Sequence, residues 1–195
     1  MIIRLAEKDD IEQIADIHQK EINKGFLSGL GSGFLEKVYL AIIKSKISFC
    51  VVDEENGKIT GFIAGAVNLD KFFRYFLKNH FFTAFFSLSP QIFNLEKIKK
   101  IIEVLFYPKK GNSLPEAELL TIAVINEFQG QGIAVQMLAR FIYEMKNRKI
   151  GSFKVIVGES LTPAIKFYEK SGFRFVKNIN IHGNYISRVY AYYIK

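Results

Sequence analysis

The residues with the clearest chemical potential lie in a short glycine-containing turn between an apolar run and a segment of helical spacing. Residues 119–125 are apolar, which is typical of a buried strand, and residues 133–147 have the periodicity of a helix. Gly130 and Gly132 stand at the junction. The first turn of a helix has unbonded N–H groups and the positive end of the helix dipole, and glycine lets an anion approach that backbone closely. The turn therefore predicts a phosphate or diphosphate site.

This turn does not match the common nucleotide-binding motifs. No Gly-Lys-Ser/Thr follows it, which excludes a Walker loop, and the three-glycine dinucleotide fingerprint is absent. Taken alone, the Gln-Gly-Gln-Gly run at 129–132 is also compatible with an ordinary helix start. A second stretch is needed to decide between these interpretations.

That second stretch is 162–173, where a proton donor lies on a short predicted helix. Thr162 is expected to be the N-cap, and Gly172 ends the helix. Tyr168 lies within it, and an unperturbed phenol with a pKa of about 10 is protonated at neutral pH and can act as an acid. The alternative for Tyr168 is a core aromatic, since it shares a helical face with Ala164.

Two carboxylates at the start of the apolar strand are candidate proton acceptors. Glu118 lies six residues before Val124, and Glu116 shares its strand face by period-two alternation. A carboxylate near its ordinary pKa needs burial or a water relay to work well as a base. The alternative is that both belong to a solvated strand edge.

Together, these stretches resemble the two signature motifs of the GNAT acetyltransferase superfamily. The first motif runs from a strand into Gln/Arg-x-x-Gly-x-Gly/Ala, which Gln129, Gly132 and Ala134 match. The later motif, Ala-Ile-x-Phe-Tyr-Glu-Lys-x-Gly-Phe, is matched without a gap from 164 to 173. The resemblance is loose in the first third of the chain and good from residue 116 onward.

The resemblance implies an α/β (α+β) fold with a mixed central β-sheet of about seven strands flanked by helices. Residues 1–195 would form a single acetyltransferase domain with a helical, Phe-rich insertion at about 69–113. In the family, the sheet splays at the strand that carries 122–124, whose exposed backbone pairs with the pantetheine arm of acetyl-CoA, while the amides of 129–134 hold the diphosphate. The implied cofactor-binding residues are Ile122, Ala123, Val124, Gln129, Gly130, Gln131, Gly132, Ile133, Ala134 and Tyr168.

The resemblance also implies catalytic roles. Tyr168 matches the tyrosine that protonates the departing thiolate, and Glu118 lies where several members have a catalytic glutamate, with Glu116 as the second candidate. A backbone N–H near Val124 would contact the developing oxyanion. The chain departs from the family at Leu161, where asparagine is frequent, so one hydrogen bond to cofactor or backbone is missing.

We therefore expect an acetyl-CoA-dependent N-acetyltransferase that transfers the acetyl group directly to an amine within a ternary complex. The insertion at 69–113 favours a roomy acceptor pocket, and the basic composition favours an anionic substrate. The first expectation is a small-molecule acceptor such as an amino sugar or a nucleotide-linked amino sugar. The alternatives are a protein acetyltransferase acting on an N-terminal amine or lysine, and a non-catalytic acyl-CoA-binding module.

Composition argues against nucleic-acid binding, an internal disulfide and a metal site. The net charge is +8, from 27 Lys and Arg against 19 Asp and Glu, but no nucleic-acid-binding motif is present, so no nucleic-acid partner is expected. Cys50 is the single cysteine, which excludes an internal disulfide. The three histidines lack metal-ligand spacing, so no metal is expected.

The apolar residues indicate where the protein is expected to work. No signal peptide and no apolar run of about eighteen residues is present, which predicts a cytoplasmic protein without a membrane span. Nine of the 19 Phe residues lie in 69–113 and are expected to pack onto the core or onto a partner subunit, so a homodimer is one expectation. Membrane-surface attachment is disfavoured because the aromatics lie on more than one helical face.

Apolar spacing predicts the other elements. A helix begins at a capping-box variant of Asp9 and Glu12 and ends at Gly25, and the glycine-rich stretch 25–33 is expected to be a mobile loop. Glycines within the strand 59–67 predict a bulge or close packing. The remaining predictions are strands at 2–5, 47–53, 153–157, 173–177 and 185–193, a hairpin turn at 54–57, and helices at 34–44 and through 98–105.

Overall fold

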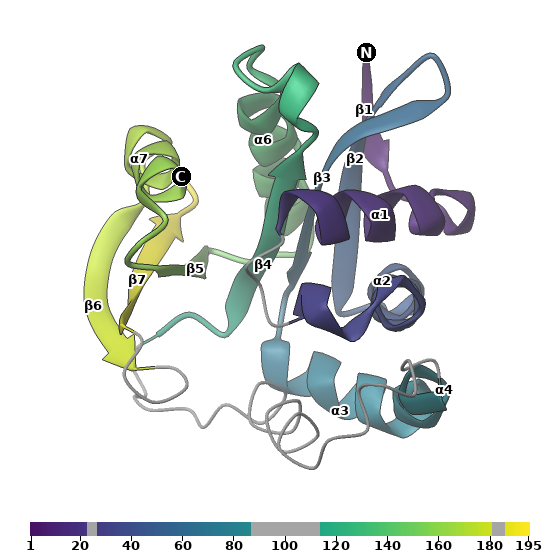
Figure 1. The fold of residues 1–195 in the computed structure, drawn as a ribbon. Coiled ribbons are helices and arrows are strands. Elements are labelled where there is room, and N and C mark those ends of the chain that lie inside the picture. The colour runs from purple at the N-terminus through teal and green to yellow at the C-terminus, as the bar shows by residue number, and fades with distance from the viewer. Residues whose placement is uncertain (23–26, 87–113, 181–185) are drawn as a thin grey trace.

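The computed structural model describes residues 1–22, 27–86, 114–180 and 186–195, in which seven strands form one mixed sheet (Figure 1). The strand order is β1-β2-β3-β4-β5-β7-β6, and every neighbouring pair is antiparallel except β4 and β5. The predicted mixed sheet of about seven strands is confirmed. The strands are β1 (Ile2–Leu5), β2 (Ser48–Glu55), β3 (Lys58–Ala66), β4 (Ala117–Val124), β5 (Ser152–Gly158), β6 (Arg174–Asn180) and β7 (Ile186–Tyr193).

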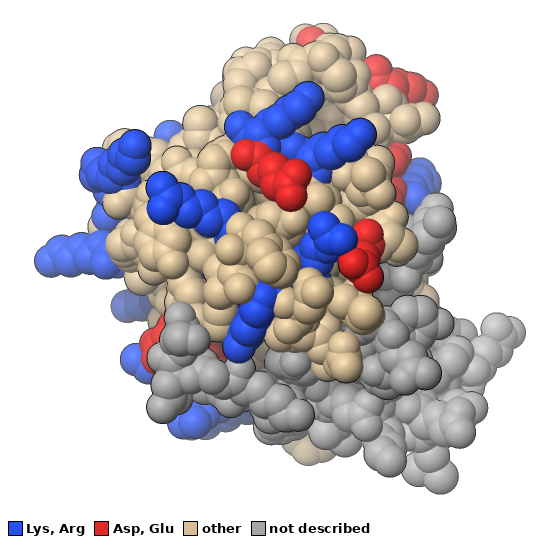
Figure 2. All heavy atoms as spheres, turned by 90° about the vertical axis from the view of Figure 1, so that its left-hand side faces the viewer, with Lys and Arg blue, Asp and Glu red and all other residues tan. Residues whose placement is uncertain are grey.

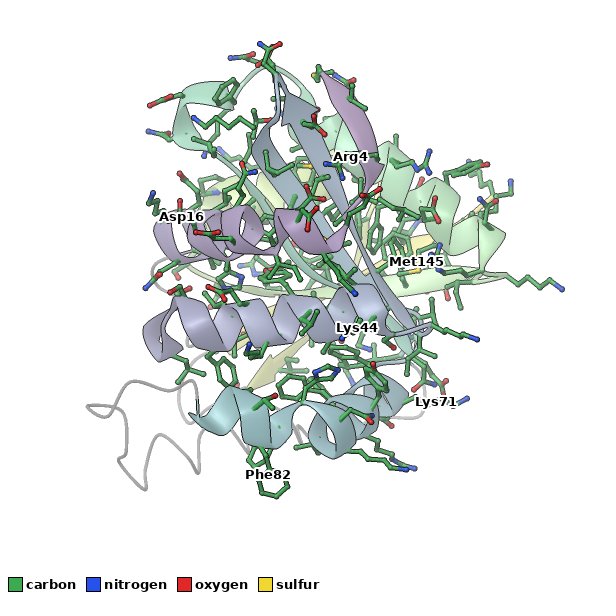
Figure 3. The ribbon with its side chains drawn as sticks, turned by 90° about the vertical axis from the view of Figure 1, so that its right-hand side faces the viewer. Arg4, Asp16, Lys44, Lys71, Phe82 and Met145 are labelled. Atoms are coloured by element: carbon green, nitrogen blue, oxygen red, sulfur yellow. The ribbon has the colours of Figure 1, made fainter. Side chains whose placement is uncertain are left out.

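Helices cover both faces of the sheet, and each face has its own hydrophobic core. On one face α1 (Ile11–Glu21), α2 (Ser32–Lys44) and α3 (Leu69–Asn79) lie in layers, with the short α4 (Phe81–Phe86) beyond them (Figure 3). On the other face lie α6 (Ile133–Asn147) and α7 (Thr162–Lys170) (Figure 1). Within the described ranges, no helix is both long enough and apolar enough to cross a bilayer.

The sheet opens between its two parallel strands. Residues Ala117–Leu119 of β4 pair with Phe153–Val155 of β5, and beyond that point β5 continues with β7 alone. The opposite edge of β4 stays paired with β3 as far as Val124. Over residues 120–124, therefore, the described strands offer β4 no partner on its β5 side, and the backbone N–H and C=O groups that point to that side have no described strand to bond.

A β-bulge lies in β4 next to this opening. The register shifts between Ala64 and Gly65 of β3, so that Leu120 is the extra residue in β4. Gly65 also permits a close contact, because a Cβ there would meet the Phe141 ring at 2.5 Å and the Glu118 carbonyl oxygen at 2.7 Å. The close packing predicted at the strand glycines is confirmed at Gly65, and the irregularity within the glycine-bearing strand is at Thr60, where the register with β2 shifts.

Gly65→Ala is expected to destabilise the fold by about 2–3 kcal/mol, because neither the ring nor the strand backbone can retreat without opening the core. Urea unfolding measures this. Gly151→Ala is the matched control, since no heavy atom lies within 4 Å of a Cβ at Gly151. Adding Phe141→Leu should restore part of the loss; equal stability of wild type and Gly65→Ala would contradict the steric account.

The insertion begins with the amphipathic helix α3 and the short, mostly apolar α4. The inner faces of α3 and α4 pack on α2 through Phe72, Phe76 and Ala84, and the Phe76 ring lies 6.4 Å from Phe34. Phe82 remains 70% exposed and points away from the helical layers (Figure 3). Packing of the aromatics onto the core is thus confirmed for part of the stretch, while the helix predicted through 98–105 lies outside the described residues.

Two local predictions near the N-terminus are wrong. The capping box joins Glu7 and Asp10, because a 3-10 turn at Lys8–Asp10 precedes α1. The stretch predicted as a mobile loop contains a second 3-10 turn at Leu27–Leu30, with α2 starting at Ser32. Burial of Leu30 in the core outweighs the entropic cost of ordering the glycines. The predicted end of α1 at Gly25 lies outside the described residues.

A buried polar pair ties α1 to α2. His18 Nδ1 and the Tyr39 hydroxyl share a 2.6 Å hydrogen bond, and both side chains are almost fully enclosed. Burial lowers the pKa of His18 from 6.5 to about 4. The imidazole is therefore neutral at physiological pH and belongs to the core.

This pair predicts a specific pH dependence of stability. An unfolded His18 binds a proton below its ordinary pKa of 6.5, whereas the folded one does not until about pH 4. The free energy of unfolding therefore decreases, and the protein becomes less stable, as the pH drops through this window. The full effect is about 3 kcal/mol. Urea unfolding at several pH values, compared with His18→Gln, measures it. A wild type and variant that lose stability in parallel would contradict the assignment.

Candidate functional site

The glycine turn predicted to bind an anion lies between β4 and α6. A 3-10 turn at Asn126–Phe128 leads into it, and residues 129–132 are all exposed. Gly130 and Gly132 have φ angles of +78° and +80°, a region that side-chain-bearing residues seldom adopt. No heavy atom lies within 4 Å of the position a Cβ at Gly130 would take. The turn is therefore an open cradle lined by main chain.

The N-terminus of α6 supplies the donors. The first bond across the helix start runs from the Gln136 N–H to the Gly132 carbonyl at 3.1 Å, so the N–H groups of the preceding turn have no helical carbonyl to bond. The aligned peptides of this 15-residue helix place partial positive charge there. Open space, free donors and positive potential together fit the diphosphate of coenzyme A.

Side chains within the turn hold its shape. Gln129 Nε2 donates to the Val124 carbonyl at 3.0 Å, which fastens the turn to the end of β4. Gln131 Nε2 reaches the Glu127 carbonyl at 3.4 Å. Because these side chains bond within the turn, the groups open to a ligand are main-chain amides, including those of Ile133 and Ala134 at the helix start.

The open edge of β4 leads directly to this cradle. Ile122, Ala123 and Val124 lie on the part of the strand that has no described partner on the β5 side. Alternate backbone groups of an unpaired strand edge can bond an extended amide chain in the way a neighbouring strand would. The pantetheine arm, with its two amides, fits such an edge, and the diphosphate cradle follows within ten residues of the chain.

Tyr168 lies on the buried face of α7. It is 5% exposed, shares the α6-side core with Ile165, and its ring centroid is 5.2 Å from that of Phe173. Burial raises the pKa of Tyr168 well above its usual 10, so the phenol keeps its proton at neutral pH. The same helix corrects one prediction: its N-cap is Leu161, and Thr162 is the first helical residue.

Glu118 lies on β4 immediately before the sheet opens. It is 8% exposed, so the solvated-edge interpretation is wrong for this residue. Leu119 enters the core under α6, and by alternation Glu118 faces the opposite side, toward the α1–α3 layers. Burial raises the pKa of Glu118, and the Lys154 ammonium, 3.1 Å from Oε2, opposes part of that rise.

Glu116 has a different setting. It lies one residue before β4 rather than on the strand, so the prediction of a shared strand face with Glu118 is wrong. Its Oε2 accepts a 2.5 Å bond from Asn68 Nδ2, and its carbonyl accepts from the Leu69 N–H at 3.2 Å. Asn68 caps α3 through the Lys71 N–H. Glu116 thus ties the first helix of the insertion to the start of β4.

Sequence reasoning missed Lys154, which the fold brings against Glu118. The signal was present as a lone lysine inside the apolar run 153–157. The wider surroundings are basic: Figure 2 shows Lys and Arg spread over the side that carries α7 and β6, where Lys166, Lys170 and Arg174 are exposed. This potential favours an anionic ligand. The described residues contain no cluster of three or more His, Cys, Asp or Glu side chains suited to a metal ion.

Comparison with solved structures finds the same fold in other proteins. SsHAT aligns over 100% of this chain and 98% of its own, with a TM-score of 0.72 and 16% identity. The ribosomal-protein-S18-alanine N-acetyltransferase of Escherichia coli aligns over 100% and 94% with a TM-score of 0.63 and 19% identity. An aminoglycoside 6'-acetyltransferase type Ii aligns over 100% and 98% with a TM-score of 0.64 and 14% identity. At these identities, the likeness establishes the fold.

Sequence comparison establishes the family. No curated protein matches the chain. The model of the acetyltransferase (GNAT) family, however, matches residues 16–173, which include β4, the glycine turn and α7. Members of this family take their acetyl group from acetyl-CoA, which the cradle and the open strand edge fit. The chain belongs to the GNAT family of acetyl-CoA-dependent acetyltransferases.

Proposed function

We propose that this enzyme transfers the acetyl group of acetyl-CoA to the amine of a small-molecule acceptor, an amino sugar or a nucleotide-linked amino sugar, directly within a ternary complex. Residues 1–195 act as one acetyltransferase domain. The observation that carries the proposal is the continuity of the open β4 edge with the glycine cradle, since it aims a bound thioester at the opening of the sheet.

Main-chain groups hold the cofactor in this proposal. The backbone of 122–124 bonds the pantetheine arm, and the amides of 129–134 bond the diphosphate. Bound acetyl-CoA supplies an activated acetyl group and a thiol leaving group. A backbone N–H near Val124 lies at the end of the open edge, where it can stabilise negative charge on the acetyl oxygen.

Two side chains move protons. Glu118, as a carboxylate, accepts a proton from the acceptor's ammonium group, directly or through one water, and so frees the lone pair that forms the new C–N bond. Tyr168 donates its phenolic proton to the sulfur as the C–S bond breaks. The nitrogen loses its second proton to solvent after attack, which balances the proton that Tyr168 regains. Glu118 then releases its own proton to solvent, and this is the net proton of the reaction. Glu116, held by Asn68, positions α3 and takes no proton.

The acceptor class is supported by charge and by the insertion. Exposed cations on the α7–β6 side favour an anionic substrate such as a nucleotide-linked sugar (Figure 2). Helix α3, the first helix of the insertion, is hydrogen-bonded to Glu116, two residues before Glu118 in the sequence. The likeness to an aminoglycoside acetyltransferase supports a sugar amine; the likeness to a ribosomal-protein acetyltransferase supports a protein acceptor as the second candidate.

Calorimetry with acetyl-CoA, followed by a thiol-release assay against matched acceptor panels, tests the proposal. One panel holds amino sugars and their nucleotide-linked forms; the other holds peptides with free N-terminal alanine or internal lysine. We expect heat on cofactor titration and turnover on the sugar panel. Turnover on peptides alone would replace the proposal by a protein acetyltransferase, and cofactor binding without turnover on either panel would favour a binding module.

A further inference from the structure

A buried lysine that the mechanism above leaves unused lies beside Glu118. Lys154 is the register partner of Glu118 in the parallel β4–β5 pair, one residue before the strands separate. Its Nζ is 3.1 Å from Glu118 Oε2 and donates a 2.6 Å bond to the Pro115 carbonyl. The two side chains are only 12% and 10% exposed. The pair therefore lies at the point where β4 and β5 begin to separate.

The geometry is unlike that of a salt bridge built for stability. A buried ion pair offsets its desolvation cost only when hydrogen bonds satisfy both partners. Here the ammonium directs its short bond to Pro115, while Glu118 Oε2 is shielded from solvent and has no well-directed hydrogen bond in the described parts of the chain. The lysine acts on the carboxylate through its charge and through one poorly directed 3.1 Å contact. A shielded lone pair held next to an open seam is suited to accept a proton.

We propose that Lys154 is a positioning residue that keeps Glu118 ionised in the absence of acceptor, so that the carboxylate is ready to take the acceptor's proton. The inference rests on the proposed function, in which Glu118 is the base. It assigns Lys154 no contact with substrate or cofactor.

The electrostatic surroundings make Lys154 the decisive group. Burial raises the pKa of Glu118, and Lys154 is the charged neighbour that lowers it. On the other side of β4, the register partner of Glu118 on β3 is Ala66, which carries no charge. Of the helices on this face, α1 and α2 contribute the mutually bonded His18 and Tyr39 to the core, and α3 carries Asp70 and Lys71 in its first turn. Without Lys154, burial would act on the pKa of Glu118 unopposed and raise it further.

The test is the pH dependence of kcat/KM for three Lys154 variants, with each compared to wild type so that the acceptor's own titration cancels. Lys154→Gln keeps a donor for Pro115 but removes the charge. The acid limb of its kcat/KM profile should move up by about one to three pH units, and activity should recover at high pH. Lys154→Met, which also loses the donor, should show the same shift. Lys154→Arg should keep the wild-type limb.

Glu118→Gln and the double variant Lys154→Gln/Glu118→Gln separate the possible failures. If Lys154 acts through Glu118, adding Lys154→Gln to Glu118→Gln should change neither rate nor profile further. An unmoved acid limb in folded Lys154→Gln overturns this inference while the proposed function stands. Full activity of Glu118→Gln overturns Glu118 as base and this inference with it, but leaves acetyl transfer itself intact. Thermal melting confirms that each variant is folded.

Discussion

Tyr168→Phe is expected to lower kcat by about 100- to 10,000-fold, the range that a positioned general acid contributes. The substitution removes one hydroxyl from a side chain that is 5% exposed, so the ring packing against Phe173 and Phe167 persists. Acetyl-CoA affinity should change little, because the proposed cofactor contacts are main-chain groups of other elements. A thiol-release assay gives kcat, and calorimetry gives the affinity.

A second tyrosine in the same cluster provides the matched control. The Tyr192 ring centroid also lies 5.2 Å from that of Phe173, so Tyr192→Phe removes a hydroxyl from comparable packing. Its kcat should equal that of wild type. Because burial raises the pKa of Tyr168, wild-type activity should also show no loss from phenol deprotonation around pH 10. Equal turnover by Tyr168→Phe and wild type would remove the acid role and leave Tyr168 as a core aromatic.

Elements with unbroken apolar periodicity were predictable from the sequence. The helix at 133–147 has the bounds that its pattern predicts because it buries one regular face against the core. The strand at 2–5 is also observed as predicted, although its residues are only partly buried. The positions where glycine is required were also visible, since few other residues fit a left-handed turn such as Gly132. The main-chain part of the candidate site could therefore be located before the fold was known.

Features that depend on register were not predictable in this way. The bulge at Leu120 and the separation of β4 from β5 arise from how strands pair across the sheet, which no local pattern encodes. The Glu118–Lys154 contact follows from the same parallel register and joins residues far apart in sequence. Glu116 shows the converse error: alternation predicted that it shares a strand face with Glu118, but β4 begins at Ala117 and the Glu116 side chain bonds Asn68 instead. Side-chain chemistry at the opening is thus a tertiary property.

Gly132→Asp is expected to weaken acetyl-CoA binding by at least about 100-fold, which corresponds to about 2.7 kcal/mol. The carboxylate would stand at the helix N-terminus where the diphosphate is proposed to bind, so it competes for the same N–H donors and repels the anion. The expected loss is in binding, while the fold persists. Calorimetric titration of acetyl-CoA into the purified variant measures it.

Gly57→Asp is the matched control because it carries the same backbone strain without the charge conflict. Gly57 has φ +79° against +80° for Gly132, and it lies in the β2–β3 hairpin turn. Both variants should lose similar, modest stability from an aspartate in the left-handed region, about 1 kcal/mol, and only Gly132→Asp should lose the cofactor. If both variants bind acetyl-CoA as wild type does, the diphosphate does not rest on this turn. In that case the open β4 edge would have to hold the cofactor without the helix dipole, and the strong salt dependence expected for a bound diphosphate should be absent as well.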